Sequence, residues 1–241
     1  MINFKNLLET IKNSLFYEKW TCNACGKEIF SGYFCNECLK SIETIGENKC
    51  EHCGRKSMYK TEYCDSCKDR NLSFNVARSV YVYKEPLSYL IQNFKYDNAK
   101  YHLEFFANEM ASVYKNEGLS CDIITFVPMH PNRLKKRAYN QAELLADALS
   151  KILNVPLVDC IEKVKDTQNQ AKLSREDRVK NLVGSFKVDK NLVKDKKVLL
   201  VDDVLTTGST VDVISKVLTS NGAKEISVLT LASVSKIVKE D

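Results

Sequence analysis

Hydrophobic residues in the second part of the chain alternate between strand-like runs and helix-like periods. Apolar runs typical of buried strands occupy residues 79–83, 122–127, 198–201 and 226–231, with a further short run at 155–158. Between these runs, apolar residues recur at helical spacing over residues 86–94, 101–114, 141–153 and 210–220. Strands that alternate with helices predict an α/β fold, with a parallel sheet covered by helices on both faces.

The first 17 residues have the period of an amphipathic helix. Phe4, Leu7, Leu8, Ile11 and Leu15 fall on one face. Charged residues interrupt this segment, which argues against a secretory signal peptide. The chain also has no run of about twenty uncharged apolar residues, as a membrane-spanning helix requires. We therefore expect a cytoplasmic protein whose thiols are kept reduced.

Ten cysteines are present, and eight of them form four C-x-x-C pairs. The pairs are Cys22/Cys25, Cys35/Cys38, Cys50/Cys53 and Cys64/Cys67. A disulfide framework is the alternative, but it is typical of secreted proteins. The C-x-x-C spacing lets two thiolates reach one tetrahedral cation from a tight turn, so it favours zinc.

The cysteine block is an internal repeat. Each half begins with C-x-x-C-G and closes with an aromatic residue before a second C-x-x-C pair. Local pairing, in which each half binds its own ion, is favoured over a cross-braced arrangement. Closed four-cysteine sites leave no coordination position for water, so the sequence predicts two structural Zn²⁺ ions.

Charge alone says little about partners. The formal net charge is +5, and two Zn²⁺ held by eight thiolates would lower it by four, to +1. The excess positive charge lies at residues 133–137, which carry four basic groups, and at 163–180, which carry six against three acids. The basic composition is therefore weak evidence for nucleic acid binding.

The strongest ligand-type motif is VLLVDDVLTTGSTV, residues 198–211. An apolar strand leads to Asp202 and Asp203, and a loop of small and hydroxyl residues then opens a helix: Thr206, Thr207, Gly208, Ser209 and Thr210. Amides and hydroxyls at a helix start can hold a phosphate, and carboxylates at a strand end can accept hydrogen bonds from ribose hydroxyls. The alternative is an ordinary helix cap, but a cap needs only one such residue.

This motif resembles the phosphoribosyl pyrophosphate (PRPP) motif of type I phosphoribosyltransferases, and the whole chain resembles the ComF family of competence proteins, ComFC type. Further matching segments are 94–96, 127–133, 137–141 and 170–181, while Ala138 stands where the family usually has glycine. The resemblance implies an N-terminal amphipathic helix at 1–17, a double zinc ribbon at 18–70 and a phosphoribosyltransferase-like domain at 71–241.

The resemblance also implies roles for individual residues. The 5-phosphate of PRPP would lie on the Thr206–Thr210 loop and its ribose on Asp202 and Asp203. The pyrophosphate, with Mg²⁺, would lie near residues 128–141. The candidate catalytic residues are Asp202, Asp203, Arg133 and Arg137; Lys135 and Lys136 could equally form a solvated face. Residues 163–181 resemble a loop that closes over PRPP, with an exposed helix and loop as the alternative.

Three functions follow. The first is a PRPP-binding protein that assists single-stranded DNA handling in natural transformation, acting directly or through a partner such as a DNA-uptake helicase. The second is a salvage-type phosphoribosyltransferase, although no residue identifies its acceptor. The third is a non-catalytic PRPP-sensing adaptor.

Aromatic residues of the cysteine block could stack on bases or form the ribbon cores: Tyr33, Phe34, Tyr59 and Tyr63.

Overall fold

The computed structural model describes residues 20–22, 24–30, 34–93, 100–167 and 181–235. The chain divides into two compact units, Met1–Ser41 and Ile42–Asp241, which are described separately below. The predicted helix at residues 1–17 lies outside the described residues. Within the described residues, no helix has the length and apolar character needed to cross a membrane.

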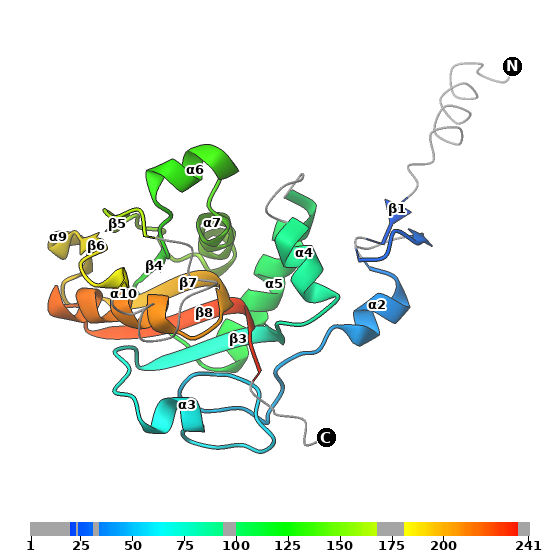
Figure 1. Cartoon of the computed structure of the whole chain (residues 1–241), viewed down its shortest axis with the longest axis horizontal. Coiled ribbons are helices and arrows are strands. Elements are labelled where there is room, and N and C mark those ends of the chain that lie inside the picture. The colour runs from blue at the N-terminus through cyan, green and yellow to red at the C-terminus, as the bar shows by residue number, and fades with distance from the viewer. Residues whose placement is uncertain (1–19, 23, 31–33, 94–99, 168–180, 236–241) are drawn as a thin grey trace, which may run out of the picture. The chain divides into compact units, whose positions relative to one another are not determined.

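A parallel sheet of four strands forms the centre of the larger unit (Figure 1). Its strands are β3 (Val76–Val82), β4 (Ile123–Phe126), β7 (Lys197–Leu205) and β8 (Glu225–Ser233). They lie in the order β3-β8-β7-β4, and each neighbouring pair is parallel. The predicted parallel α/β sheet is therefore confirmed. The short strand predicted at 155–158 is only an isolated bridge between Ile124 and Leu157.

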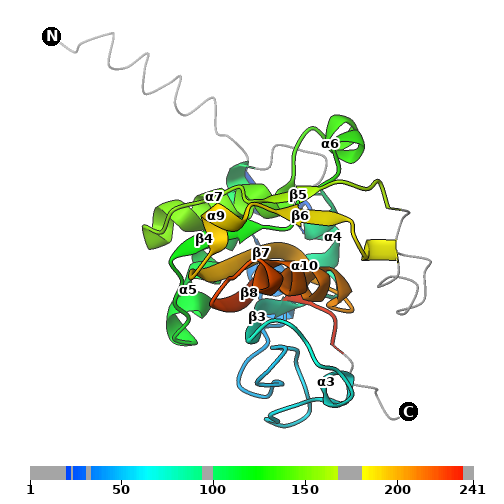
Figure 2. The ribbon, with the colours of Figure 1, turned by 90° about the vertical axis from the view of Figure 1, so that its left-hand side faces the viewer.

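Helices cover both faces of this sheet, as predicted (Figures 1 and 2). Helix α5 (Lys100–Asn116) and helix α7 (Gln141–Leu153) pack on each other and on one face. Helix α10 (Ser209–Ser220) packs on the other face through Val211, Ile214 and Leu218. Helix α4 (Leu87–Asn93) follows β3, and α6 (Pro131–Arg137) precedes α7. The long strands are buried almost throughout, which explains their unbroken apolar runs.

A small antiparallel pair was not predicted. Strands β5 (Ile161–Lys163) and β6 (Phe186–Val188) pair with each other, and the short helix α9 (Lys190–Val193) follows them. Ile161 and Phe186 belong to the same core cluster as the inner face of α10. Figure 2 shows the pair beyond β4 and β7, at the far side of the sheet from β3.

Each half of the cysteine block folds locally. The first half has strands β1 (Trp20–Thr21) and β2 (Glu28–Ile29), then helix α2 (Asn36–Ser41). Its sulfurs lie within 4.8 Å of one another: Cys22, Cys25, Cys35 and Cys38. The second half includes α3 (Asp65–Lys68) and brings together Cys50, Cys53, Cys64 and Cys67 in the same way. The structure thus has the local pairing that the repeat predicts.

The donor chemistry of both clusters fits zinc. All four donors in each cluster are sulfur atoms, and most of these cysteines are buried. Contacts with Cys53 and Cys67 hold the pKa of Cys50 far below that of a free thiol, while the contact with Cys50 raises the pKa of Cys53 to about 12. Thiols this close cannot all lose their protons unless a cation lies among them.

The second ribbon, defined here as residues 42–70, covers the outer edge of β3. Main-chain hydrogen bonds join Ile45 to Val80 and Glu43 to Val82, at 3.0 and 2.8 Å. The amide of Ala77 donates to the carbonyl of His52 at 2.8 Å. Gly54 approaches this strand so closely that a Cβ would clash with the Ala77 carbonyl oxygen and lie 2.9 Å from the Cα of Arg78. The ribbon therefore completes the backbone pairing of an edge strand.

Ion pairs reinforce this packing. Arg78, on β3, donates to the Glu51 carbonyl oxygen at 2.7 Å and to the Glu117 carboxylate at 2.6 Å. Lys49, beside the first cysteine of the second cluster, pairs with Glu117 at 2.9 Å. Glu117 follows the end of α5, so one carboxylate joins the ribbon, the edge strand and a helix.

We predict two Zn²⁺ ions per chain. Cys22→Ser and Cys53→Ser should each lower the metal content from two ions to one, because the clusters are separate four-thiolate sets. Cys121→Ser is the matched control, since Cys121 belongs to neither cluster, and it should retain both ions. Metal analysis of freshly purified protein tests this. Fewer than two ions in the native chain, or loss of an ion from the control, would contradict it.

We predict that Glu117→Gln lowers the free energy of unfolding by about 1–2 kcal/mol at pH 7, since it removes charge from two partly buried hydrogen-bonded pairs. Burial would raise the pKa of Glu117, but Lys49 and Arg78 outweigh it and hold this pKa below its usual value. The stabilisation is therefore complete above the unfolded pKa and is lost as the pH falls through the folded pKa. Urea unfolding of both proteins at several pH values measures this. A difference that persists unchanged at low pH would contradict it.

Candidate functional site

The loop between β7 and α10 is a tight turn at the carboxyl edge of the sheet. Gly208 is the N-cap of α10 and has φ 78°, in the left-handed region that favours glycine. The Oγ1 of Thr207 lies 3.0 Å from the Oγ of Ser209 and accepts the Ser209 amide at 3.3 Å. Ser209 is buried, whereas Thr206 is exposed. The loop thus presents main chain and hydroxyl groups at a helix start, which is a suitable place for an anion.

Asp202 and Asp203 lie in the second half of β7, which ends at Leu205 before this loop. Both are partly buried. The Oδ1 of Asp202 accepts the Asp203 amide at 2.9 Å, and the Oδ1 of Asp203 accepts the Val204 amide at 2.7 Å. These bonds hold each carboxylate against the amide of the residue that follows it. The residues of the predicted motif thus occupy the end of β7, the loop and the first turn of α10.

Lys163, at the end of β5, belongs to the same region. Its Nζ lies 5.6 Å from the ring centroid of Phe186. Burial and the nearby charge of Arg133 lower its pKa, while Asp166 and Asp202 act in the opposite direction. A partly buried lysine that feels both Asp202 and Arg133 is a candidate ligand for a phosphate group. In the sequence, Lys163 stands out only as part of the basic segment at 163–180.

Helix α6 carries the other basic candidates. Pro131 is its first residue, and the side chain of His130 caps it by accepting the Asn132 amide at 3.3 Å. The helix ends at Ala138, which has φ 66°. This left-handed conformation favours glycine, the residue that the resembling family has there. Lys135 and Lys136 are exposed, and Arg137 is partly buried.

Arg133 bridges α6 to the segment after β5. Its guanidinium donates to the Thr167 carbonyl oxygen and lies 3.6 Å from Asp166. Asn132 donates to the same carboxylate at 3.1 Å. The hydrogen bond from Asn132, with the charges of His130, Arg133 and Lys163, holds the pKa of Asp166 below its usual value. Arg133 is therefore a bridging side chain rather than a solvated one. Residues 168–180 of the predicted closing loop, with Gln170, Arg175 and Arg178, lie outside the described residues.

A cavity of about 500 Å³ opens beside α6 and the β5–β6 pair. Its lining is partly apolar, with Met129, Leu134 and Ile161. Glu143 and Asp159 also line it, and burial together with the Asp159 charge raises the pKa of Glu143. Lys163 faces this cavity as well. It is large enough for a small planar molecule.

Two arginines of the second ribbon contact the loop and were not predicted as site residues. Arg55 donates to the Thr206 carbonyl oxygen at 2.6 Å, and Arg70 donates to that of Thr207 at 3.1 Å. Arg70 also pairs with Asp212 in α10 at 3.5 Å. These contacts span 151, 137 and 142 residues of sequence, so no local pattern could have indicated them.

Comparison with known proteins identifies two domains. A family model described as a double zinc ribbon domain matches residues 13–68. A model described as a phosphoribosyl transferase domain matches residues 140–241. The first match contains both cysteine clusters, and the second contains Asp202, Asp203 and the Thr206–Thr210 loop.

Three curated relatives resemble most of the chain. "Competence protein F" of Haemophilus influenzae is 38% identical over 82% of this chain and 89% of its own length. "Competence protein ComFC" of Streptococcus pneumoniae is 27% identical over 82% of this chain and 86% of its own. "DNA utilization protein YhgH" of Escherichia coli O157:H7 is 29% identical over 86% of this chain and 94% of its own.

The resemblance stated from the sequence is thereby confirmed. Similarity extends over both the ribbon region and the phosphoribosyltransferase region, and it reaches 38% identity with a competence protein. The chain belongs to the ComF family of competence proteins and joins a double zinc ribbon domain to a phosphoribosyltransferase domain.

Proposed function

We propose that the protein binds PRPP at the carboxyl edge of its sheet. The observation that carries the proposal is the position of Asp202 and Asp203 beside the Thr206–Thr210 loop at the start of α10. Ligands of open α/β sheets bind where the carboxyl ends of the strands meet. The phosphoribosyl transferase domain match covers all of these residues.

Each part of the site suits one part of PRPP. The amides and hydroxyls of the Thr206–Thr210 loop suit the 5-phosphate. The carboxylates of Asp202 and Asp203 suit the ribose hydroxyls, because carboxylates are strong acceptors. Mg²⁺ would bind together with the pyrophosphate and neutralise part of its charge.

Basic side chains suit the pyrophosphate. Lys163 lies close enough to Asp202 and Arg133 to feel both charges. Arg133 and Arg137 both belong to α6, and Arg133 lies close enough to Lys163 to lower its pKa. Because Arg133 also bonds to Thr167, pyrophosphate binding would change how α6 is joined to the segment after β5.

A transferase reaction would need an acceptor, and the cavity beside Lys163 is where we place it. The apolar part of its lining suits a planar ring, and Glu143 and Asp159 would accept hydrogen bonds from amino groups. A salvage-type phosphoribosyltransferase is the second candidate function on this ground. Pyrophosphate release from PRPP in the presence of an acceptor would distinguish it from a non-catalytic PRPP-sensing adaptor.

For the biological role, we propose that the protein assists the handling of single-stranded DNA in natural transformation. The relatives are named competence and DNA utilization proteins. Arg133, Lys135, Lys136 and Arg137 on α6 would contact the strand, or a partner such as a DNA-uptake helicase would do so instead. Eight clustered thiols suit a reducing compartment, so we place this role in the cytoplasm.

The PRPP site predicts the effect of removing both carboxylates. Asp202→Ala with Asp203→Ala should weaken PRPP binding by about 3–6 kcal/mol, because each lost charge-assisted hydrogen bond costs about 1.5–3 kcal/mol. Zinc content and the unfolding temperature should stay nearly unchanged. Calorimetry with PRPP and Mg²⁺ measures the affinity.

The matched control removes the same charge elsewhere. Asp65→Ala with Asp147→Ala changes two carboxylates whose side chains are 99% and 46% exposed, and it should bind PRPP like the native chain. Equal affinities for the site variant and the control would refute the assignment. Absence of PRPP binding to the native chain would do so as well.

The DNA role predicts a salt-dependent interaction. A plot of the logarithm of single-strand affinity against the logarithm of salt concentration should have a negative slope of about 0.7 for each phosphate neutralised. Lys135→Ala with Lys136→Ala should lower this slope by about 1–2 units, and PRPP should compete for the strand. Fluorescence anisotropy with an oligonucleotide at several salt concentrations measures both effects.

Lys115→Ala with Lys224→Ala is the control, since both lysines are exposed. Lys224 directly precedes β8 and Lys115 is near the end of α5, before β4, so both lie towards the amino ends of the strands. The control should leave the slope unchanged. Direct DNA contact is excluded if the native chain fails to bind single strands at low salt. It is also excluded if PRPP does not compete with the strand and the Lys135→Ala, Lys136→Ala variant keeps the native salt slope. The link to transformation would then run through a partner.

A further inference from the structure

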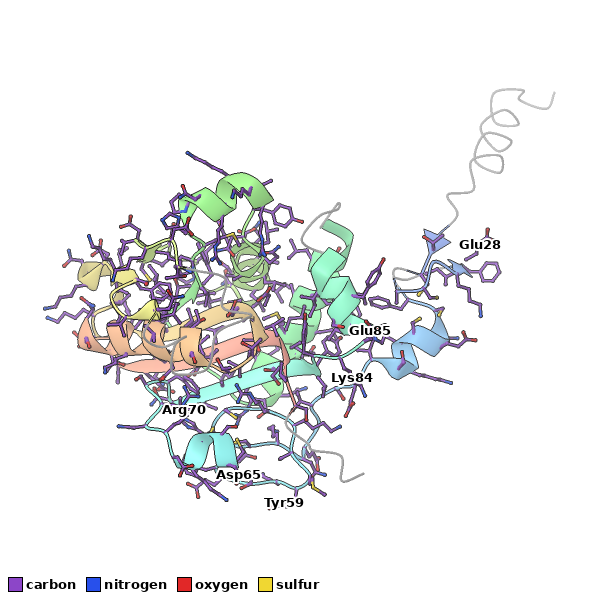
Figure 3. The ribbon with its side chains drawn as sticks, in the orientation of Figure 1. Glu28, Tyr59, Asp65, Arg70, Lys84 and Glu85 are labelled. Carbon is purple, nitrogen blue, oxygen red and sulfur yellow. The ribbon has the colours of Figure 1, made fainter. Side chains whose placement is uncertain are left out.

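The second ribbon, which packs along β3, contacts the Thr206–Thr210 loop through two arginines. Arg55 follows the cluster's first C-x-x-C pair, and Arg70 follows its second pair. Their guanidinium groups donate to the carbonyl oxygens of Thr206 and Thr207, at 2.6 and 3.1 Å. In Figure 3, Arg70 lies on the side of the ribbon nearer the sheet, whereas Asp65 and Tyr59 point away from it.

These bonds fix the direction of two peptide groups. In a trans peptide, the C=O and the following N–H point in opposite directions, and the cis bond among the described residues is Glu85–Pro86. The carbonyls of Thr206 and Thr207 point towards the ribbon. The amides of Thr207 and Gly208 therefore point away from it, to the other side of the loop.

Both guanidinium groups lie close to Gly208. A Cβ built on this glycine would be 3.6 Å from the Nη2 of Arg55 and 4.0 Å from the Nη1 of Arg70. Arg55 is only 5% exposed, and its Nε has no hydrogen-bond partner among the described residues. Arg70 is paired with Asp212 at 3.5 Å, so, within the part of the chain that the structure describes, Arg55 carries the positive charge on this side of the loop that no ion pair balances. That charge and the two amides on the other side make the loop favourable for an anion.

Packing alone does not require this arrangement. Main-chain bonds to β3 and the ion pairs of Glu117 already hold the ribbon on the sheet. Burying a guanidinium beneath a glycine turn carries a desolvation cost that those contacts do not need. An anion on the far side of the turn would compensate for it.

We propose that Arg55 and Arg70 are positioning residues that hold the Thr206–Thr210 loop in its phosphate-binding conformation. The second ribbon is then part of the ligand site, although neither arginine touches the ligand. This inference rests on the proposed PRPP function and extends it, because it assigns the 5-phosphate of the sugar to amides that the ribbon orients.

The test separates the two ends of PRPP. Arg55→Met and Arg70→Met should each weaken binding of ribose 5-phosphate by about 10- to 100-fold, the range for a hydrogen bond to a charged group. Pyrophosphate with Mg²⁺ should bind these variants as it binds the native chain. Calorimetry measures both ligands on zinc-loaded protein, with two ions per chain as the condition for comparison.

A spectroscopic readout reports the loop itself. In the native chain, ribose 5-phosphate should shift the amide resonances of Thr207 and Gly208, and in the arginine variants this shift should shrink. Arg55→Lys and Arg70→Lys keep the charge and should recover part of the affinity. If a methionine variant fails to fold, these lysine variants decide the outcome by their affinity relative to the native chain.

Glu117→Gln is the matched control. It loosens the ribbon's attachment to β3 without changing a residue that contacts the loop. It should lower stability but leave ribose 5-phosphate affinity unchanged. If it weakens binding as much as the arginine variants do, the arginines act only through docking, and the proposal is overturned.

The remaining outcomes are distinct. If the native chain binds neither PRPP nor ribose 5-phosphate, the proposed function fails. If the native chain binds both and the arginine variants match it in affinity and amide shifts, the proposed function stands but this inference fails.

Discussion

The outer edge of β3 exposes main-chain groups that have to be paired or covered, and the second ribbon covers them. Its hydrogen bonds to Ala77, Val80 and Val82 leave the four thiols of the second cluster close to the sheet. Gly54 is required at the closest approach, because any side chain would collide with the β3 backbone. From this position Arg55 and Arg70 reach the turn after β7. One packing solution therefore protects an edge strand and places two cations beneath the Thr206–Thr210 loop.

The opposite side of the site is built from charge pairs. The Asp166 carboxylate contacts His130, Asn132 and Arg133. Lys163 is close enough to Asp166 and Asp202 for both charges to act on its pKa. The basic residues at 133–137 form one charged run in the sequence, but their side chains have different surroundings in the structure. Arg133 is engaged with the segment after β5, while Lys135 and Lys136 are exposed on α6. A ligand with several negative charges would compete with Asp166 for the same cations.

Long apolar patterns made much of this fold predictable. The strands β3, β4, β7 and β8 and the helices α5, α7 and α10 all coincide with predicted segments, because each buries several residues on the sheet. Strand β7 runs on to Leu205 rather than ending at Val201, since Asp202 and Val204 still pair with β8. Strands β5 and β6 were missed because three residues with one buried side chain give no period. The PRPP-type motif was found because its residues are contiguous. Arg55 and Arg70 could not be found, because only the tertiary packing of the ribbon brings them to the loop.

The central claim is that the ribbon-supported loop after β7 holds the phosphate of a phosphorylated ribose. A crystal structure of the zinc-loaded chain with PRPP and Mg²⁺ tests it most directly. We predict that the 5-phosphate lies on the amides of Thr207 and Gly208, with Arg55 and Arg70 still bonded to the carbonyls of Thr206 and Thr207. A phosphate bound elsewhere, or loop carbonyls turned away from both arginines in the complex, would contradict it.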